Sequence, residues 1–207
     1  MMTPVPASSC RHPGHGGAVP TTWMTDGHPH LRWDDLRRSE PRLAARARER
    51  LVDPGVLLVA TIRGDGTPRV SPVEPLVLAG DLWLSMMWRS RKASDLRRDD
   101  RVLLHSVVTT RDGAEGEVKL RGRARPVDDL DARARYCEAV AALGWRPEEP
   151  WFHLFRIEIE DLTSIRYAPT GDQHVARWPG RSEFVRRATS ATSVGPPEPT
   201  VDLFPDR

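Results

Sequence analysis

The feature that most constrains the fold is a series of short apolar segments, each about the length of one strand, separated by tight turns. Val56–Ala60 is the longest apolar run and continues as a strand to Ile62. The Gly-Asp-Gly sequence after it supplies the positive φ angles of a hairpin loop, and Pro68–Val73 returns as the partner strand. A second hairpin joins Leu76–Leu78 to Leu82–Met87. This spacing predicts an antiparallel meander instead of alternating parallel β-α units.

The rest of the chain adds strands to this meander. In Phe152–Ile159 the alternation of side chains places Phe155, Ile157 and Ile159 on one face, which is the period of a half-buried strand. Six or more antiparallel strands with few helices favour a barrel that is closed or partly closed, because closure removes exposed strand edges. The other predicted strands are Val102–Val108, Glu117–Ala124, Ile165–Tyr167 and Gln173–Trp178.

Three helices are predicted from their caps and their periodicity. A short one spans Ser90–Arg98. Ser39 can cap a second, with Leu43, Ala47 and Leu51 on one face. The third is capped by Asp128 or Asp129 and carries an apolar stripe formed by Leu130, Ala134, Cys137 or Glu138, and Ala141.

The two ends of the chain differ from this centre in composition. Residues 1–30 are rich in Pro, Gly and His, and the last residues carry several prolines without periodicity. We therefore predict disordered ends at 1–30 and 188–207 and one folded domain at 31–187, a size that fits a chain of 207 residues. No segment is apolar for long enough to span a membrane, and the N-terminus lacks the order of a secretory signal. The sequence predicts a cytoplasmic protein.

Charge and cysteine usage exclude several functions. A formal net charge of +2 gives no electrostatic footprint for nucleic acid. Cys10 and Cys137 are predicted to be free thiols, and no metal site is expected because the N-terminal cysteine and histidines lack a second cysteine pair. Glycine-rich nucleotide loops and a Gly-x-Ser-x-Gly nucleophile are absent, so no catalytic residue is assigned. The N-terminal residues concerned are Cys10, His12, His15, His28 and His30.

Lysine is scarce in this chain, which makes the two lysines informative. Of the 31 basic residues only Lys92 and Lys119 are lysines, so a generic positive charge is supplied by arginine. Lys92 follows Ser90 and Arg91 at the predicted start of a helix, where backbone N–H groups and the helix dipole favour an anion. The sequence thus indicates a phosphate site here. The alternative is an ordinary capped helix with solvated charges.

A second candidate segment is Arg69-Val70-Ser71-Pro72 in the predicted strand Pro68–Val73. Arg69 and Ser71 point to the same side of the strand, and Pro72 removes a backbone donor. A strand of this kind can lay its edge along a flat polar ligand. The alternative is an ordinary edge strand.

Together these segments resemble the pyridoxamine 5′-phosphate oxidase-like flavoproteins, the flavin or deazaflavin split barrels. The resemblance covers roughly residues 51–178 and rests on the order of its parts. These are the Gly-Asp-Gly hairpin, Arg69–Val73, a strand that ends in Ser85-Met86, the string that begins at Ser90-Arg91-Lys92, and Glu117–Gly122. The resemblance implies a six-stranded antiparallel split barrel, mainly β with flanking helices. It also implies a homodimer with cofactor bound between the subunits.

Carried over by position, the resemblance assigns a cofactor site. Ser90, Arg91 and Lys92 would hold the phosphate of FMN or of the deazaflavin F420, between which the sequence does not choose. The strand from Arg69 through Val70 to Ser71 would run beside the phosphate and the ring edge, Ser85 and Met86 would line the ribityl chain and ring, and Trp178 would contact cofactor of the partner subunit. The implied activity is that of an oxidoreductase acting on a small organic substrate.

Two departures leave the substrate open. The true oxidases of the family carry a glutamine where Glu117 stands, and their C-terminal substrate-binding segment is not found after Trp178. One alternative is a split barrel that carries or senses flavin or haem without turnover, with His105 or His153 as an axial ligand. Another is a structural or regulatory barrel with an empty cleft.

Overall fold

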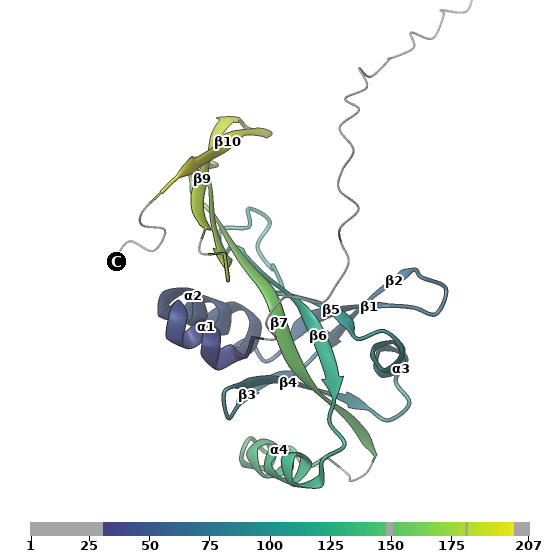
Figure 1. Cartoon of the computed structure of the whole chain (residues 1–207). Coiled ribbons are helices and arrows are strands. Elements are labelled where there is room, and N and C mark those ends of the chain that lie inside the picture. Colours follow the sequence, from purple (N-terminus) through teal and green to yellow (C-terminus); the bar gives the residue numbers. More distant parts are fainter. Residues whose placement is uncertain (1–30, 148–150, 181, 201–207) are drawn as a thin grey trace, which may run out of the picture.

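The computed structural model describes residues 31–147, 151–180 and 182–200. In these residues, six antiparallel strands wrap into a barrel (Figure 1), paired in the order β2-β1-β5-β6-β7-β4. Their bounds are β1 Leu57–Ile62, β2 Pro68–Val73, β4 Asp81–Met87, β5 Arg101–His105, β6 Glu117–Pro126 and β7 Phe152–Tyr167. Among the described strands, β2 and β4 pair with other neighbours but not with each other, so the barrel is open between them. The fold is the six-stranded split barrel predicted from the sequence.

Strand β7 holds the barrel together because it is long enough to serve two sheets. Its first half pairs with β4 and its second half with β8 (Gln173–Trp178), while β6 follows it along nearly its whole length. Ile165–Tyr167, predicted as a separate strand, is the end of β7. The β6–β7 register shifts at Gly122, where a Cβ would lie 2.0 Å from the Glu158 carbonyl oxygen. Only glycine allows this close approach of the two strands.

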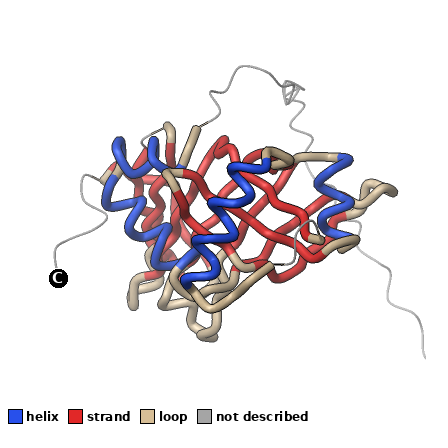
Figure 2. Tube along the Cα trace, turned by 90° about the horizontal axis from the view of Figure 1, so that it is seen from below, coloured by secondary structure: helices blue, strands red, loops and turns tan. Residues whose placement is uncertain are grey.

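The helices lie around the outside of the strands (Figure 2). They are α1 Trp33–Ser39, α2 Pro41–Ala47 with a π-helical turn η1 at Arg48–Val52, α3 Arg91–Arg98 and α4 Leu130–Ala142. The short strand β3, Pro75–Leu78, forms a hairpin with β4. Within the described residues, no helix is both long enough and apolar enough to cross a membrane.

The main core fills the barrel with apolar side chains from α2, η1 and the six strands. Phe155, Ile157 and Ile159 are fully buried in it, as the alternation in the sequence predicts. A smaller cluster under α4 packs Tyr136 and Val140 against β4 and β7. Burial of these side chains on opposite faces of β4 and β7 fixes the register of both strands.

Two helix predictions need correction. Leu43, Ala47 and Leu51 are buried on one face as predicted, but Ser39 ends the unforeseen helix α1 and α2 begins at Pro41. Proline suits the first position of a helix, so the start of α2 needs no serine cap. In α4 the cap at Asp129 is correct and the stripe is not, because the buried side chains are Arg133, Tyr136 and Val140 while Leu130 is exposed. Arg133 and Tyr136 have polar ends, but their long apolar parts can be buried, and the predicted stripe left them out.

The C-terminal boundary of the domain also needs correction. The sheet continues beyond residue 187 through β9, Ser182–Ser190, and β10, Ser193–Pro199, which extend it past β8. The prolines of β10 sit on the outermost strand, where proline is best tolerated, and the β9–β10 register shifts between Val194 and Pro197. The predictions for residues 1–30, including those for Cys10 and its neighbouring histidines, and for 201–207 lie outside the described residues.

Candidate functional site

The N-terminus of α3 and the outer edge of β2 meet at the opening of the barrel. Strand β2 pairs with β1 only, so one of its edges is unpaired in the described chain. At this edge Lys92 Nζ donates a hydrogen bond to the Pro72 carbonyl oxygen. The two segments that the sequence singled out are therefore brought together, although they are far apart along the chain.

Ser90 forms the predicted N-cap of α3. Its backbone is extended, and its Oγ accepts a hydrogen bond from Ala93 N at 3.3 Å. The N–H groups of Arg91 and Lys92 precede the first intrahelical donor and point out of the helix end. The Arg91 side chain is exposed and makes no ion pair within the described ranges. This end of the helix can accept an anion from outside the chain.

Lys92 is half-buried, and burial lowers the pKa of its ammonium group, while Glu74 acts in the opposite direction. Its hydrogen-bond partner is a carbonyl, which carries no charge to compensate the ammonium. A phosphate placed here would supply that charge. The residues present therefore fit a phosphorylated cofactor.

Asp95 joins β1, β2 and α3 below this edge and was not identified as a site residue from the sequence. It is only 4% exposed and accepts hydrogen bonds from Arg69 Nε at 2.7 Å and Thr61 Oγ1 at 3.0 Å. Burial opposes its charge, but Arg69 and Thr61 hold the pKa of Asp95 below its usual value. Asp95 thus positions Arg69 under the edge of β2. A signal for Asp95 was present in the sequence, because an acidic residue on α3 can pair with polar residues of β1 and β2 such as Thr61 and Arg69.

The remaining residues of β2 divide between its two faces. Arg69 and Ser71 lie beside Thr61 and Val59 of β1 and face the barrel, whereas Val70 faces outward and is 62% exposed. Backbone groups of β2 and the side chains of Arg69 and Ser71 are therefore what this strand offers at the opening.

The other three predicted site residues lie on β4 and β8. Ser85 and Met86 point to opposite faces of β4: Ser85 interacts with Tyr136 of α4, and Met86 is buried in the barrel core at 3% exposure. Trp178 is buried too, and its Nε1 donates to Ser39 Oγ at 2.8 Å. Trp178 is therefore packed against residues of its own chain.

The loop between β4 and α3 presents an aromatic stack that the sequence did not reveal. Trp88 stacks on His153 with ring centroids 4.9 Å apart and meets Trp151 edge to face at 5.6 Å. Arg89, next to Trp88, has a left-handed backbone with φ of 60°. His153 is held under Trp88, and burial first, then Arg97 and Arg133, lowers its pKa.

Both ring nitrogens of His105, one of the two haem-ligand candidates, make contacts within the chain. Its Nδ1 lies 2.6 Å from the Ser106 carbonyl oxygen and its Nε2 lies 3.2 Å from a carboxylate oxygen of Glu117. Binding of iron would break one of these contacts. The described residues also contain no group of three or more His, Cys, Asp or Glu side chains that could hold a metal ion.

The chain is similar to several solved structures. A Listeria innocua protein described as a candidate pyridoxamine 5′-phosphate oxidase is 17% identical, with a TM-score of 0.50 over 60% of this chain and 96% of that chain. A heme-binding protein from Mycobacterium smegmatis is 21% identical, with a TM-score of 0.49 over 64% of this chain and 57% of that one. An F420 reductase is 18% identical, with a TM-score of 0.43 over 56% and 94%.

A family model gives the sequence relationship. No curated protein matches the chain. The model for pyridoxamine 5′-phosphate oxidase matches residues 43–166, which run from α2 to the end of β7 and include the whole barrel. The match spans more than half of the 207 residues, and the barrel opens where the predicted phosphate-binding residues meet. The chain therefore belongs to the pyridoxamine 5′-phosphate oxidase family.

Proposed function

We propose that this protein is an oxidoreductase that binds FMN or the deazaflavin F420 and acts on a small organic substrate. The observation that carries the proposal is the meeting of the α3 N-terminus with the unpaired edge of β2 at Lys92 and Pro72, in a chain of this family. The phosphate of such a cofactor needs a positively charged group, and its flat ring needs an adjacent polar strand edge. The opening of the barrel offers both.

In this proposal, Ser90, Arg91 and Lys92 hold the cofactor phosphate. Arg91 supplies a bidentate fork and Lys92 a compact charge, in addition to the backbone N–H groups of the helix end. Arg69, held by Asp95, and Ser71 line the approach along β2. Met86 and Trp178 are left out of the side-chain contacts because both are buried in the core.

The bound ring would supply hydride transfer, so the protein need provide only binding, orientation and local electrostatics. This division of labour is compatible with a sequence that contains no nucleophile motif. The residues at the opening bind and orient, and the adjoining core residues exclude water from the barrel interior.

The same proposal includes a homodimer with the cofactor between subunits. The unpaired edge of β2 and the exposed Val70 would be covered by a second copy, because an open strand edge otherwise invites pairing with other chains. Light scattering at micromolar concentration is expected to give a dimer. A clean monomer would contradict the interfacial site.

The test is a titration of the purified protein with FMN and with F420, followed by fluorescence. Loss of one charge-assisted hydrogen bond costs about 1.5–3 kcal/mol, so Lys92→Ala is expected to weaken binding of the preferred cofactor about tenfold or more. The matched control is Arg97→Ala, which removes an exposed cation from the same helix. Unchanged affinity of Lys92→Ala with an intact fold would rule out the phosphate assignment, and binding of neither cofactor would rule out the function.

A further inference from the structure

Four titratable side chains gather outside the site described above, on the outward face of β5, β6 and β7. Glu117 lies at their centre. One of its carboxylate oxygens is 2.7 Å from Lys119 Nζ and the other is 3.2 Å from His105 Nε2. Tyr167 faces the same carboxylate, and burial together with Glu117 raises the pKa of Tyr167, so its hydroxyl keeps its proton.

The hydrogen bond at the far side of the His105 ring determines where one proton sits. Nδ1 lies 2.6 Å from the Ser106 carbonyl oxygen, and a carbonyl only accepts, so Nδ1 carries a hydrogen. Ser106 is itself fixed, because its N–H and its Oγ both bond to the backbone of Val118. The tautomer of His105 is therefore set by the backbone.

This tautomer places Nε2 of a neutral ring, which has only a lone pair there, against a carboxylate oxygen of Glu117. Two acceptors 3.2 Å apart repel each other unless a proton lies between them. The geometry thus favours one proton shared by His105 and Glu117. The pair is partly shielded from water, with side-chain exposures of 29% for His105 and 15% for Glu117.

The surroundings of the pair favour proton transfer to solvent or ligand through Lys119. This side chain is the most exposed of the three linked groups at 39%, and it forms an ion pair with the second oxygen of Glu117. Around the cluster, β1 contributes the apolar Leu58 beside His105, and β7 contributes Thr163 beside Lys119. Beyond Thr163 lies Arg177, which stacks over Phe184 at 5.4 Å.

The cluster shares the outward face of the sheet with Pro72 and Val70, opposite to the face that carries the Arg69 and Ser71 side chains. Pro72, Leu58, His105 and Lys119 are consecutive cross-strand partners and so lie in one row. With strands about 4.8 Å apart, the backbone of Pro72 is about 10 Å from that of His105. Pro72 is the residue whose carbonyl accepts from Lys92. A ligand of cofactor size could therefore span the two.

The identity of Lys119 carries further weight. The chain supplies positive charge with arginine at all but two of its 31 basic positions. Arginine at 119 would keep the charge and a bond to Glu117, but a guanidinium does not release its proton in proteins. Lysine at this position retains what arginine would lose, the ability to give up a proton.

We propose that His105 and Glu117 store one proton and that Lys119 delivers it to the cleft when reduction places negative charge there. This inference rests on the proposed function. An N–H bond of Lys119 breaks and its proton goes to the reduced ligand, while the two electrons come from a hydride donor or a chemical reductant such as dithionite. Glu117 then takes the shared proton from His105 Nε2 and passes a proton to Lys119, which restores the ammonium group. Solvent finally reprotonates the ring.

The first experiment needs no cofactor. Nitrogen-15 NMR of the His105 ring at neutral pH is expected to show protons on both nitrogens in the wild type and only on Nδ1 in Glu117→Gln, whose amide can donate to Nε2. The wild type and Glu117→Gln are compared for fold by circular dichroism. A neutral ring in the wild type would overturn the stored proton.

The second experiment measures the midpoint potential of the bound cofactor against pH, using dithionite and a reference dye. The pH slope is expected to change in Glu117→Gln and in Lys119→Arg, which keeps the charge and so separates proton release from simple electrostatics. Arg121→Gln, on the same face of β6, is the control and should keep the wild-type slope. Wild-type slopes in both test variants would overturn delivery by Lys119. Failure of the wild type to bind either cofactor would overturn the proposed function and this delivery with it, while the NMR result would still decide the stored proton.

Discussion

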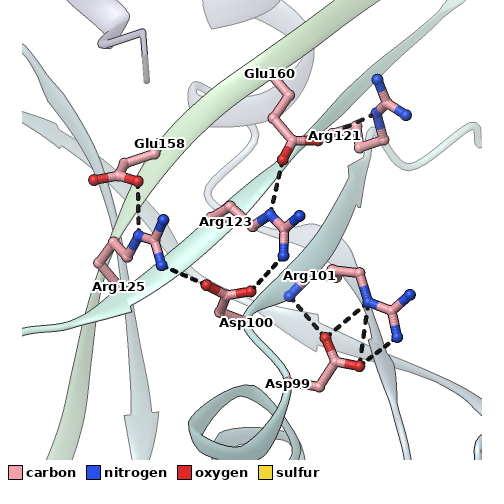
Figure 3. Close-up of polar contacts among 8 residues, drawn as sticks. All are labelled: Asp99, Asp100, Arg101, Arg121, Arg123, Arg125, Glu158 and Glu160. Atoms are coloured by element: carbon pink, nitrogen blue, oxygen red, sulfur yellow. Dashed lines mark hydrogen bonds and ion pairs between the residues drawn. The ribbon is translucent and has the colours of Figure 1, made fainter. Parts of the chain in front are cut away.

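The two ends of α3 carry opposite electrostatic arrangements. After its C-terminus, Asp99 binds Arg101, and Asp100 bridges Arg123 and Arg125 of β6. Figure 3 shows how carboxylates of β7 complete this network, with Glu160 on Arg123 and Glu158 on Arg125. At the N-terminus, Arg91 and Lys92 form no ion pair with any carboxylate of the described chain.

The difference shows which charges serve the fold and which are left for a ligand. With 31 basic and 29 acidic residues, the chain holds enough carboxylates to pair most of its cations. At the paired end, Asp100 ties the start of β5 to β6 and fixes the position of both strands. At the other end, cations beside a helix N-terminus are left to an anion from outside. This contrast can be tested by substitutions at Asp95, by substitutions at either end of α3, and by a change of pH.

The largest effect is expected from Asp95→Asn, at the buried anchor between the two ends. Removing the carboxylate leaves the Arg69 guanidinium without its partner and weakens the link between α3 and β2. Because Arg69 and Arg98 can reach water, we expect about 2 kcal/mol less stability, below the range for fully buried pairs. Urea denaturation measures it, with Arg97→Ala, which removes an exposed arginine of α3 that does not pair with Asp95, as the control. A variant as stable as the wild type would show that Asp95 does not anchor β2.

The next largest effect is expected from Arg91→Ala, and its comparison with Arg101→Ala separates cofactor affinity from protein stability. Arg91→Ala at the unpaired end is expected to weaken cofactor binding by about three- to tenfold, with little change in melting temperature. Arg101→Ala, which loses its bond to Asp99, should do the opposite and leave affinity unchanged. Fluorescence titration and thermal melts of both variants give the two readouts. Equal effects of the two variants on affinity would contradict the division of labour.

A smaller effect is expected from Asp100→Asn within the paired network. The variant keeps the shape of the side chain but removes the charge that bridges Arg123 and Arg125. Because these side chains are 26–38% exposed, solvent screens them, and the expected loss is about 1 kcal/mol at low salt. The loss should shrink in 1 M NaCl as screening increases. A loss that does not depend on salt would point to packing instead of charge.

Sequence reasoning predicted the barrel because its signals are local. The hairpin glycines, the alternation before Ile159 and the caps at Ser90 and Asp129 each depend on residues close together in the chain. The prediction of the C-terminal boundary was wrong because the pairing of β10 is not a local signal. Strand β10 reads as a proline-rich tail, and only pairing with β9, itself placed by β8, makes it part of the sheet.

The charged residues of the candidate site could be predicted from the sequence, but the burial of its apolar residues could not. Ser90, Arg91 and Lys92 follow from helix-start chemistry, whereas the positions of Met86 and Trp178 depend on which face of a strand meets the core. Contacts distant in sequence were also out of reach, such as Arg69 with Asp95 and the row that joins Pro72 to His105. Each of these depends on strand register, which composition and spacing do not determine.

The smallest expected effect is the pH dependence contributed by Asp99. The hydrogen bond from Arg101 holds the pKa of Asp99 below its ordinary value, although burial opposes this. A carboxylate with a lowered pKa in the folded state stabilises the protein above its unfolded pKa of about 3.9, and this contribution disappears as the pH falls through the folded pKa. Asp99→Asn should therefore lower stability by about 0.5 kcal/mol at pH 7 and by less as the pH falls toward 2, in urea titrations at matched salt. A difference that does not shrink with falling pH would mean that Asp99 acts through its position at the end of α3, and the contrast between the two helix ends would then not be electrostatic at this residue.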